Sequence, residues 1–186
     1  HRQTTSLIVS ENAGIKKLLK RMARELNYRN HQLPLPAVDR VEERAEELLQ
    51  YLHGVVPEGQ PWLVKTTWTL VFGEVWKVAF PEARWLFVQR NIMDIVRSNQ
   101  RHPVMRKRDV QSVYMFASAL RRRQHYIAQT TPDGNSLFVD IDRVASCDME
   151  ECERVLRFCG LTPREEVIKQ WIKPEMWHGR KLKEIC

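Results

Sequence analysis

Trp85-Leu86-Phe87-Val88-Gln89-Arg90-Asn91-Ile92-Met93-Asp94-Ile95-Val96-Arg97-Ser98 is the stretch that decides the fold. Its apolar start predicts a strand over 85–89, and the chain then turns at Asn91 into a helix over 92–101. Asn91 is a favourable N-cap, and Asp94 fits a capping box three residues later. The junction brings Arg90 and Ser98 to the positive start of a helix, which suits a phosphate monoester. An ordinary turn with a solvated arginine is the alternative.

Outside this stretch, apolar residues recur at helical spacing in several segments, and two more short apolar runs read as strands. Because short strands separated by helices favour a parallel sheet with both faces covered, we predict an α/β fold. Ligands of such sheets gather beyond the carboxyl ends of the strands, so Lys65 and Arg90 are expected to converge. Thr162-Pro163-Arg164-Glu165 predicts a capping box that starts a helix, with Pro163 at the first helical position. The other predicted helices cover 11–30, 38–53, 69–79, 109–129 and 147–159, and the other strands cover 62–65 and 137–141.

The chain has 186 residues and a formal net charge of +7, which indicates one globular domain and an anionic partner. The three arginines at 121–123 are expected on solvated helix faces, because consecutive helical residues point in different directions. No apolar run reaches the length of a membrane span. The four cysteines form no metal signature and are read as buried free thiols. They favour a reducing compartment such as the cytoplasm, with the Golgi lumen as the alternative.

The segment Arg90-Asn91-x-x-Asp94-x-x-x-Ser98, which follows a Pro81-Glu82-Ala83-Arg84 turn and a strand, resembles the 3′-phosphate-binding segment of sulfotransferases. These enzymes use 3′-phosphoadenosine-5′-phosphosulfate as donor. The resemblance implies that Arg90 and Ser98 bind the 3′-phosphate of the nucleotide. It also implies a P-loop NTPase-like fold, a three-layer sandwich with a short parallel sheet between helices. Ile92 stands where many family members have proline.

Two further segments resemble the family's catalytic elements. Trp62–Thr67 is similar to the strand that ends in Lys-Thr-His in cytosolic sulfotransferases, which implies that Lys65 contacts the donor and stabilises the transferring group. Thr67 occupies the place of the histidine base and cannot act as one. Glu11 is therefore the candidate base, by similarity to carbohydrate-directed members; the alternative is an acid that stabilises the helix start.

Two C-terminal segments also carry the resemblance. Arg180, within Trp177–Lys181, matches a C-terminal loop that reaches the nucleotide in relatives, and an ordinary basic terminus is the alternative. The segment from Phe138 to Leu161 is similar to a family strand that ends in an acidic pair and continues into a helix. There Asp142 is expected to anchor the following loop.

The family's glycine-rich 5′-phosphosulfate loop has no counterpart in this sequence. We therefore interpret residues 1–186 as a single sulfotransferase-like domain that lacks its first strand and nucleotide loop. The predicted function is transfer of a sulfuryl group to a hydroxyl or amine, with no metal. The acceptor is an anionic glycan, a small molecule or a protein. The alternatives are a non-catalytic nucleotide-binding or assembly protein of the same fold, and a basic nucleic-acid binder, which the lack of a base-reading motif disfavours.

Overall fold

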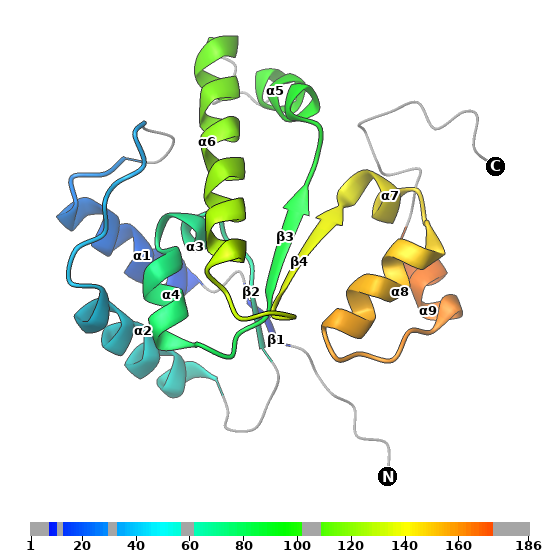
Figure 1. The fold of residues 1–186 in the computed structure, drawn as a ribbon, viewed down its shortest axis with the longest axis horizontal. Helices are drawn as coiled ribbons and strands as arrows, with labels where there is room; N and C mark the ends of the chain where they lie inside the picture. Colours follow the sequence, from blue (N-terminus) through cyan, green and yellow to red (C-terminus); the bar gives the residue numbers. More distant parts are fainter. Residues whose placement is uncertain (1–7, 11–12, 30–32, 57–61, 102–108, 173–186) are drawn as a thin grey trace. The chain divides into compact units, whose positions relative to one another are not determined.

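The protein is a mixed α/β chain that is mostly helical, with short pairs of parallel strands (Figure 1). The computed structural model describes residues 8–10, 13–29, 33–56, 62–101 and 109–172. The chain divides into two compact units after Ala83, and each holds one parallel strand pair. No helix within the described ranges is long and apolar enough to cross a bilayer.

The first unit contains strands β1 (Ile8–Ser10) and β2 (Trp62–Val64), which pair in parallel. Parallel strands need a crossover connection, and here α1 (Ala13–Glu25) and α2 (Val41–Val55) form it. Two short helices, α3 (Trp68–Val71) and α4 (Gly73–Ala79), follow β2. Apolar side chains of the helical part form the core, and the most deeply buried of them are Ile15, Leu19, Met22, Ala23, Ala45, Leu48, Phe72 and Val75.

The helices of the first unit follow the apolar spacing of the sequence. α1 lies within the predicted helix 11–30 and buries the expected residues Ile15, Leu18, Leu19 and Met22. The helix predicted over 38–53 begins later, at Val41. The helix predicted over 69–79 is two short helices that meet at Phe72. β1 was not predicted, because three residues are too few for a periodic pattern.

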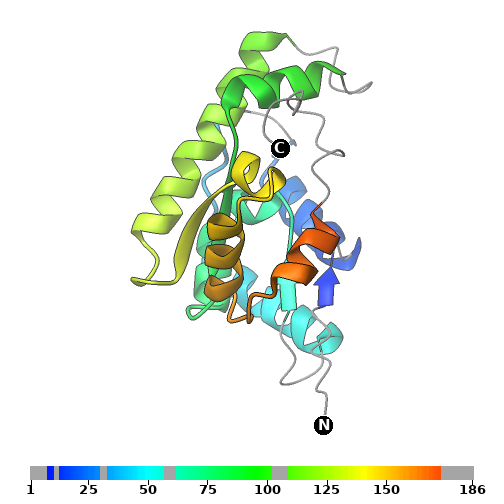
Figure 2. The same ribbon diagram turned by 90° about the vertical axis from the view of Figure 1, so that its right-hand side faces the viewer.

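The second unit contains strands β3 (Trp85–Gln89) and β4 (Ser136–Asp140), which pair in parallel along their whole length. α5 (Ile92–Arg101) and α6 (Val110–Gln129) connect the strands and lie side by side (Figures 1 and 2). Three further helices follow β4, namely α7 (Ile141–Ala145), α8 (Met149–Phe158) and α9 (Glu165–Trp171). Gln89 is the register partner of Asp140, so the carboxyl ends of both strands lie next to each other, at the same edge of the pair.

Carboxylate caps set the start of three helices in the second unit. Asp109 accepts a hydrogen bond from the backbone N–H of Ser112, two residues into α6. Asp140 caps α7 and Asp148 caps α8 in the same manner. A short acidic side chain at the N-cap satisfies backbone N–H groups that have no partner inside the helix. These caps explain why the predicted helices 109–129 and 147–159 begin close to the expected residues.

The predicted capping box at Thr162–Glu165 is wrong. α9 begins at Glu165, and Arg164 occupies the N-cap position without a capping side-chain hydrogen bond. Pro163 therefore precedes the helix instead of starting it. The chain reaches this segment through Gly160, whose φ of 74° lies in the left-handed region that glycine adopts easily.

The three predicted strands are present within one residue of their expected bounds, which confirms an α/β chain with short parallel strands. Among the described residues these three strands and β1 form two separate two-stranded sheets, one in each unit, instead of one sheet. The three-layer sandwich, the P-loop NTPase-like topology and the single domain over 1–186 stay predictions.

Candidate functional site

The candidate site lies in the second unit, where β3 ends and α5 begins. Arg90 directly follows the strand, and Asn91 is the residue before the helix. The side-chain oxygen of Asn91 accepts a hydrogen bond from the backbone N–H of Met93 at 2.9 Å. This N-cap is the one predicted from the sequence. The carboxylate of Asp94, expected in a capping box, accepts from Arg97 Nη1 at 3.2 Å.

Arg90 forms an ion pair with Asp142, with 3.8 Å between Nε and Oδ1. Both side chains are about four-fifths buried, at 20% and 18% exposure. Asp142 belongs to the first turn of α7, directly after β4. Arg90 and Asp142 thus lie at the same end of the β3–β4 pair, because the carboxyl ends of the two parallel strands lie side by side.

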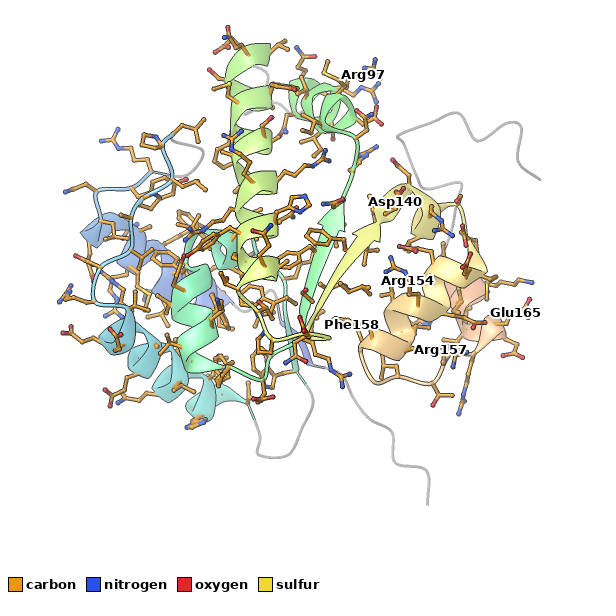
Figure 3. All side chains as sticks on the ribbon, viewed as in Figure 1. Arg97, Asp140, Arg154, Arg157, Phe158 and Glu165 are labelled. Atoms are coloured by element: carbon orange, nitrogen blue, oxygen red, sulfur yellow. The ribbon has the colours of Figure 1, made fainter. Side chains whose placement is uncertain are left out.

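The roles of the two acids at the end of β4, Asp140 and Asp142, differ from the expectation. Asp142 was expected to anchor the following loop, but Asp140 performs this task. Asp140 lies at the end of β4 (Figure 3) and accepts from the backbone N–H groups of Asp142 and Arg143 at 2.9 and 3.4 Å. Asp142 instead faces Arg90. The signal in the sequence was the position of Asp142, which follows a strand parallel to the one that Arg90 follows.

Helix α6 contributes a second arginine to the junction. Arg121 Nη2 donates a hydrogen bond to the backbone carbonyl of Arg90. The expectation that Arg121 lies on a solvated face is therefore wrong, whereas Arg122 is exposed. The guanidinium of Arg123 lies over the ring of Tyr126, 5.3 Å from its centroid.

A buried carboxylate, that of Glu151 on α8, supports the end of β4. Glu151 is 1% exposed and accepts from the backbone N–H of Asp140 at 3.1 Å. Arg154 donates to it from Nη2 at 2.6 Å and from Nε at 3.0 Å. Arg143 Nη1 donates to Oε2 of Glu151 at 3.4 Å. Arg154 also reaches from α8 to the carbonyl of Phe138 in β4 (Figure 3). Sequence reasoning missed this network.

The remaining predicted site residues are spread over the chain. Ser98 lies in the second turn of α5, on the strand–helix segment that contains Arg90, and its side chain is exposed. Lys65 directly follows β2 in the first unit and is exposed. Its expected proximity to Arg90 stays a prediction. Glu11 and Arg180 lie outside the described residues.

The cysteines match the expectation in part. Cys152 is a buried free thiol, and burial raises its pKa. Cys159 is a free thiol but exposed, so the expected burial is wrong there. Within the described part of the chain, no group of three or more histidine, cysteine or acidic residues could hold a metal ion.

No family model, curated protein or solved structure matches this chain. The residues that the structure brings together are Arg90, Asp142 and Arg121, at the carboxyl edge of the β3–β4 pair. This arrangement can hold an anion beside the start of α5, since the arginine side chain and the helix N-terminus both attract negative charge.

The carboxylates beside β4 make the stability of the protein depend on pH. The hydrogen bond from Arg154 lowers the pKa of Glu151, and the hydrogen bond from Arg143 lowers that of Asp148. A carboxyl group with a lower pKa in the folded state stabilises the fold above its unfolded pKa and loses this effect as the pH falls through the folded value. We expect the free energy of unfolding to decrease below about pH 4.

Urea titrations followed by circular dichroism at several pH values measure this effect. Glu151→Gln removes the negative charge that accepts hydrogen bonds from Arg154, so the variant should be less stable than the wild type at pH 7. The glutamine does not titrate, so this position no longer contributes to the pH dependence. The difference between the two should shrink as the pH falls. A difference that stays constant from neutral to acidic pH would exclude Glu151 as a source of the pH dependence.

Proposed function

We propose that the protein is a sulfotransferase that binds 3′-phosphoadenosine-5′-phosphosulfate with its 3′-phosphate at the β3–α5 junction. The observation that carries the proposal is the guanidinium of Arg90, which is four-fifths buried at the end of a parallel strand. The helix that follows begins two residues later, at Ile92. In this proposal the sheet is part of a P-loop NTPase-like, three-layer α/β fold.

The surroundings of Arg90 fit a doubly charged phosphate. The ion pair with Asp142 measures 3.8 Å, which is longer than a hydrogen bond. A phosphate oxygen within hydrogen-bond distance of the guanidinium interacts more strongly, because it carries more charge and matches the planar fork of the arginine. Asp142 holds the side chain at the edge of the strand pair until the phosphate arrives. Ser98, exposed on α5, is the proposed second ligand of this phosphate.

The donor supplies the sulfuryl group. In the proposed reaction an acceptor hydroxyl or amine forms a bond to sulfur, and the bond between sulfur and the bridging oxygen of the donor breaks. The acceptor proton passes to a base, for which Glu11 is the candidate, and adenosine 3′,5′-bisphosphate leaves. Lys65 is proposed to stabilise the charge on the transferring group, and Arg180 to contact the nucleotide. Catalysis of this kind depends on positioning and electrostatic stabilisation.

Replacement of Arg90 by alanine should weaken binding of adenosine 3′,5′-bisphosphate by about 1.5–3 kcal/mol, the usual contribution of a hydrogen bond to a charged group. Isothermal titration calorimetry on the whole chain measures the loss. Arg157→Ala is the matched control, because Arg157 is an exposed arginine of α8 in the same unit, 67% exposed. The control should bind as the wild type does. Equal affinity of wild type and Arg90→Ala would remove the assignment.

A second experiment separates the enzyme from a non-catalytic nucleotide-binding or assembly protein. The chain is incubated with sulfur-labelled donor and a panel of acceptors that includes anionic glycans, small alcohols and amines, and peptides. Transfer of label supports the sulfotransferase. Binding of the bisphosphate without transfer to any acceptor would favour the non-catalytic alternative. Binding that depends steeply on salt and tolerates loss of Arg90 would favour a nucleic-acid partner.

A further inference from the structure

We infer that Arg121 on α6 is a positioning residue, which orients Arg90 for the 3′-phosphate through the protein backbone. The inference rests on the proposed function and extends it to a residue that the sequence assigned to solvent. Its basis is the hydrogen bond from Arg121 Nη2 to the carbonyl oxygen of Arg90. This contact joins residues 31 positions apart in the chain.

Arg121 is part of a row of side-chain donors along β3. Gln124, nearly one helical turn further along α6, has its Nε2 3.5 Å from the carbonyl oxygen of Val88. Alternate residues of a strand direct their carbonyl groups to the same side. Arg121 and Gln124 therefore contact β3 and its continuation from one side, at the carbonyl groups of Arg90 and Val88. The helix thereby holds the backbone beyond Gln89, the last residue that pairs with β4.

The two ends of Arg90 are thus held by different elements. Arg121 on α6 fixes its carbonyl group, and Asp142 on α7 lies beside its guanidinium. A side chain that is held before the ligand arrives loses less conformational freedom on binding. Loss of the Arg121 contact should therefore weaken the interaction of Arg90 with a phosphate, without removing any group that touches the ligand.

The neighbouring arginine of α6 provides a matched control. Arg122 is exposed, whereas Arg121 is partly buried. Arg121→Met keeps the apolar stem and a high helix propensity but removes the donor. Arg122→Met makes the same chemical change at the exposed position.

The test measures binding of adenosine 3′,5′-bisphosphate and of adenosine 5′-monophosphate, which lacks the 3′-phosphate. The proteins are the wild type, Arg90→Ala, Arg121→Met, Arg122→Met and the double variant Arg90→Ala/Arg121→Met. Arg121→Met should bind the bisphosphate about tenfold more weakly than the wild type does, which corresponds to the contribution of one hydrogen bond. Its affinity for the monophosphate should be unchanged. Because Arg121 acts through Arg90, the double variant should bind no more weakly than Arg90→Ala. Arg122→Met should match the wild type.

Three results would overturn the inference. Wild-type affinity in Arg121→Met would show that the contact is unimportant for binding. Additive losses in the double variant would assign Arg121 an independent role. Equal losses for both nucleotides, with a lower melting temperature, would leave only a structural role. Failure of the proposed function looks different, because the wild type itself would then not prefer the bisphosphate to the monophosphate.

Discussion

Replacement of Glu151 by alanine should lower the free energy of unfolding by about 3 kcal/mol, because it breaks a buried ionic network. The side chain of Glu151 is 2% exposed, and its carboxylate accepts hydrogen bonds from Arg154 and from the backbone N–H of Asp140. Without it, the N–H group loses its partner beside the end of β4. The side chains of Arg154 and Arg143, which also contact this carboxylate, are 43% and 44% exposed, so both can recover part of their hydration. This keeps the expected loss at the lower end for a broken buried pair. Urea titration at pH 7 measures it.

The adjacent residue gives the control for this prediction. Glu150 also forms an ion pair with Arg143, at 3.3 Å, but its side chain is 88% exposed. Exposed ion pairs contribute little, so Glu150→Ala should change the free energy of unfolding by less than about 0.5 kcal/mol. Equal effects of the two substitutions would contradict the view that burial makes Glu151 important.

Arg44→Ala should destabilise the first unit by about 2–3 kcal/mol, through lost charged hydrogen bonds and lost packing of the buried side-chain stem. Arg44 on α2 is 4% exposed. It donates to Glu25 at 2.8 Å, to the Asp39 carboxylate at 2.9 Å and to the Asp39 carbonyl at 3.0 Å. It thus ties the end of α1 and the segment before α2 to the core. Thermal or urea unfolding of the whole chain measures the loss.

Arg40 is the matched control in the same segment. It also lies beside Glu25, at 3.8 Å, but its side chain is 57% exposed. Arg40→Ala should lower stability by less than about 1 kcal/mol. A loss as large as that of Arg44→Ala would indicate that net charge, and not the buried hydrogen bonds, stabilises this unit.

Local sequence signals predicted the strand–helix junction well. The four apolar residues of β3 and Gln89 are followed by Arg90 and by Asn91, whose side chain caps α5. Helix α1 was also predictable, because its buried residues recur at helical spacing over three turns. In both cases the information lies within a few residues of the chain.

The contacts that shape the site were not predictable in the same way. Arg121 reaches Arg90 from a different helix, and consecutive arginines carry no signal of which one is buried. Glu151 stands three residues after the N-cap Asp148, a spacing typical of an acid at a solvated helix start. Its burial depends on α8 lying against the end of β4, which follows from packing. Local patterns identify the strand ends, and the tertiary arrangement decides which side chains meet there.

The connection through two helices has a consequence for how the chain folds. The partners in each parallel pair, such as Trp85 and Ser136, stand about fifty residues apart, so pairing them closes a long loop and is entropically unfavourable early on. Contacts between neighbours in sequence, such as those within α5 and α6, have no such barrier. The carboxyl end of the β3–β4 pair, which needs both strands, should therefore be among the last parts of the second unit to assemble. Pulsed hydrogen exchange during refolding would detect this as late protection of the β3 and β4 amides.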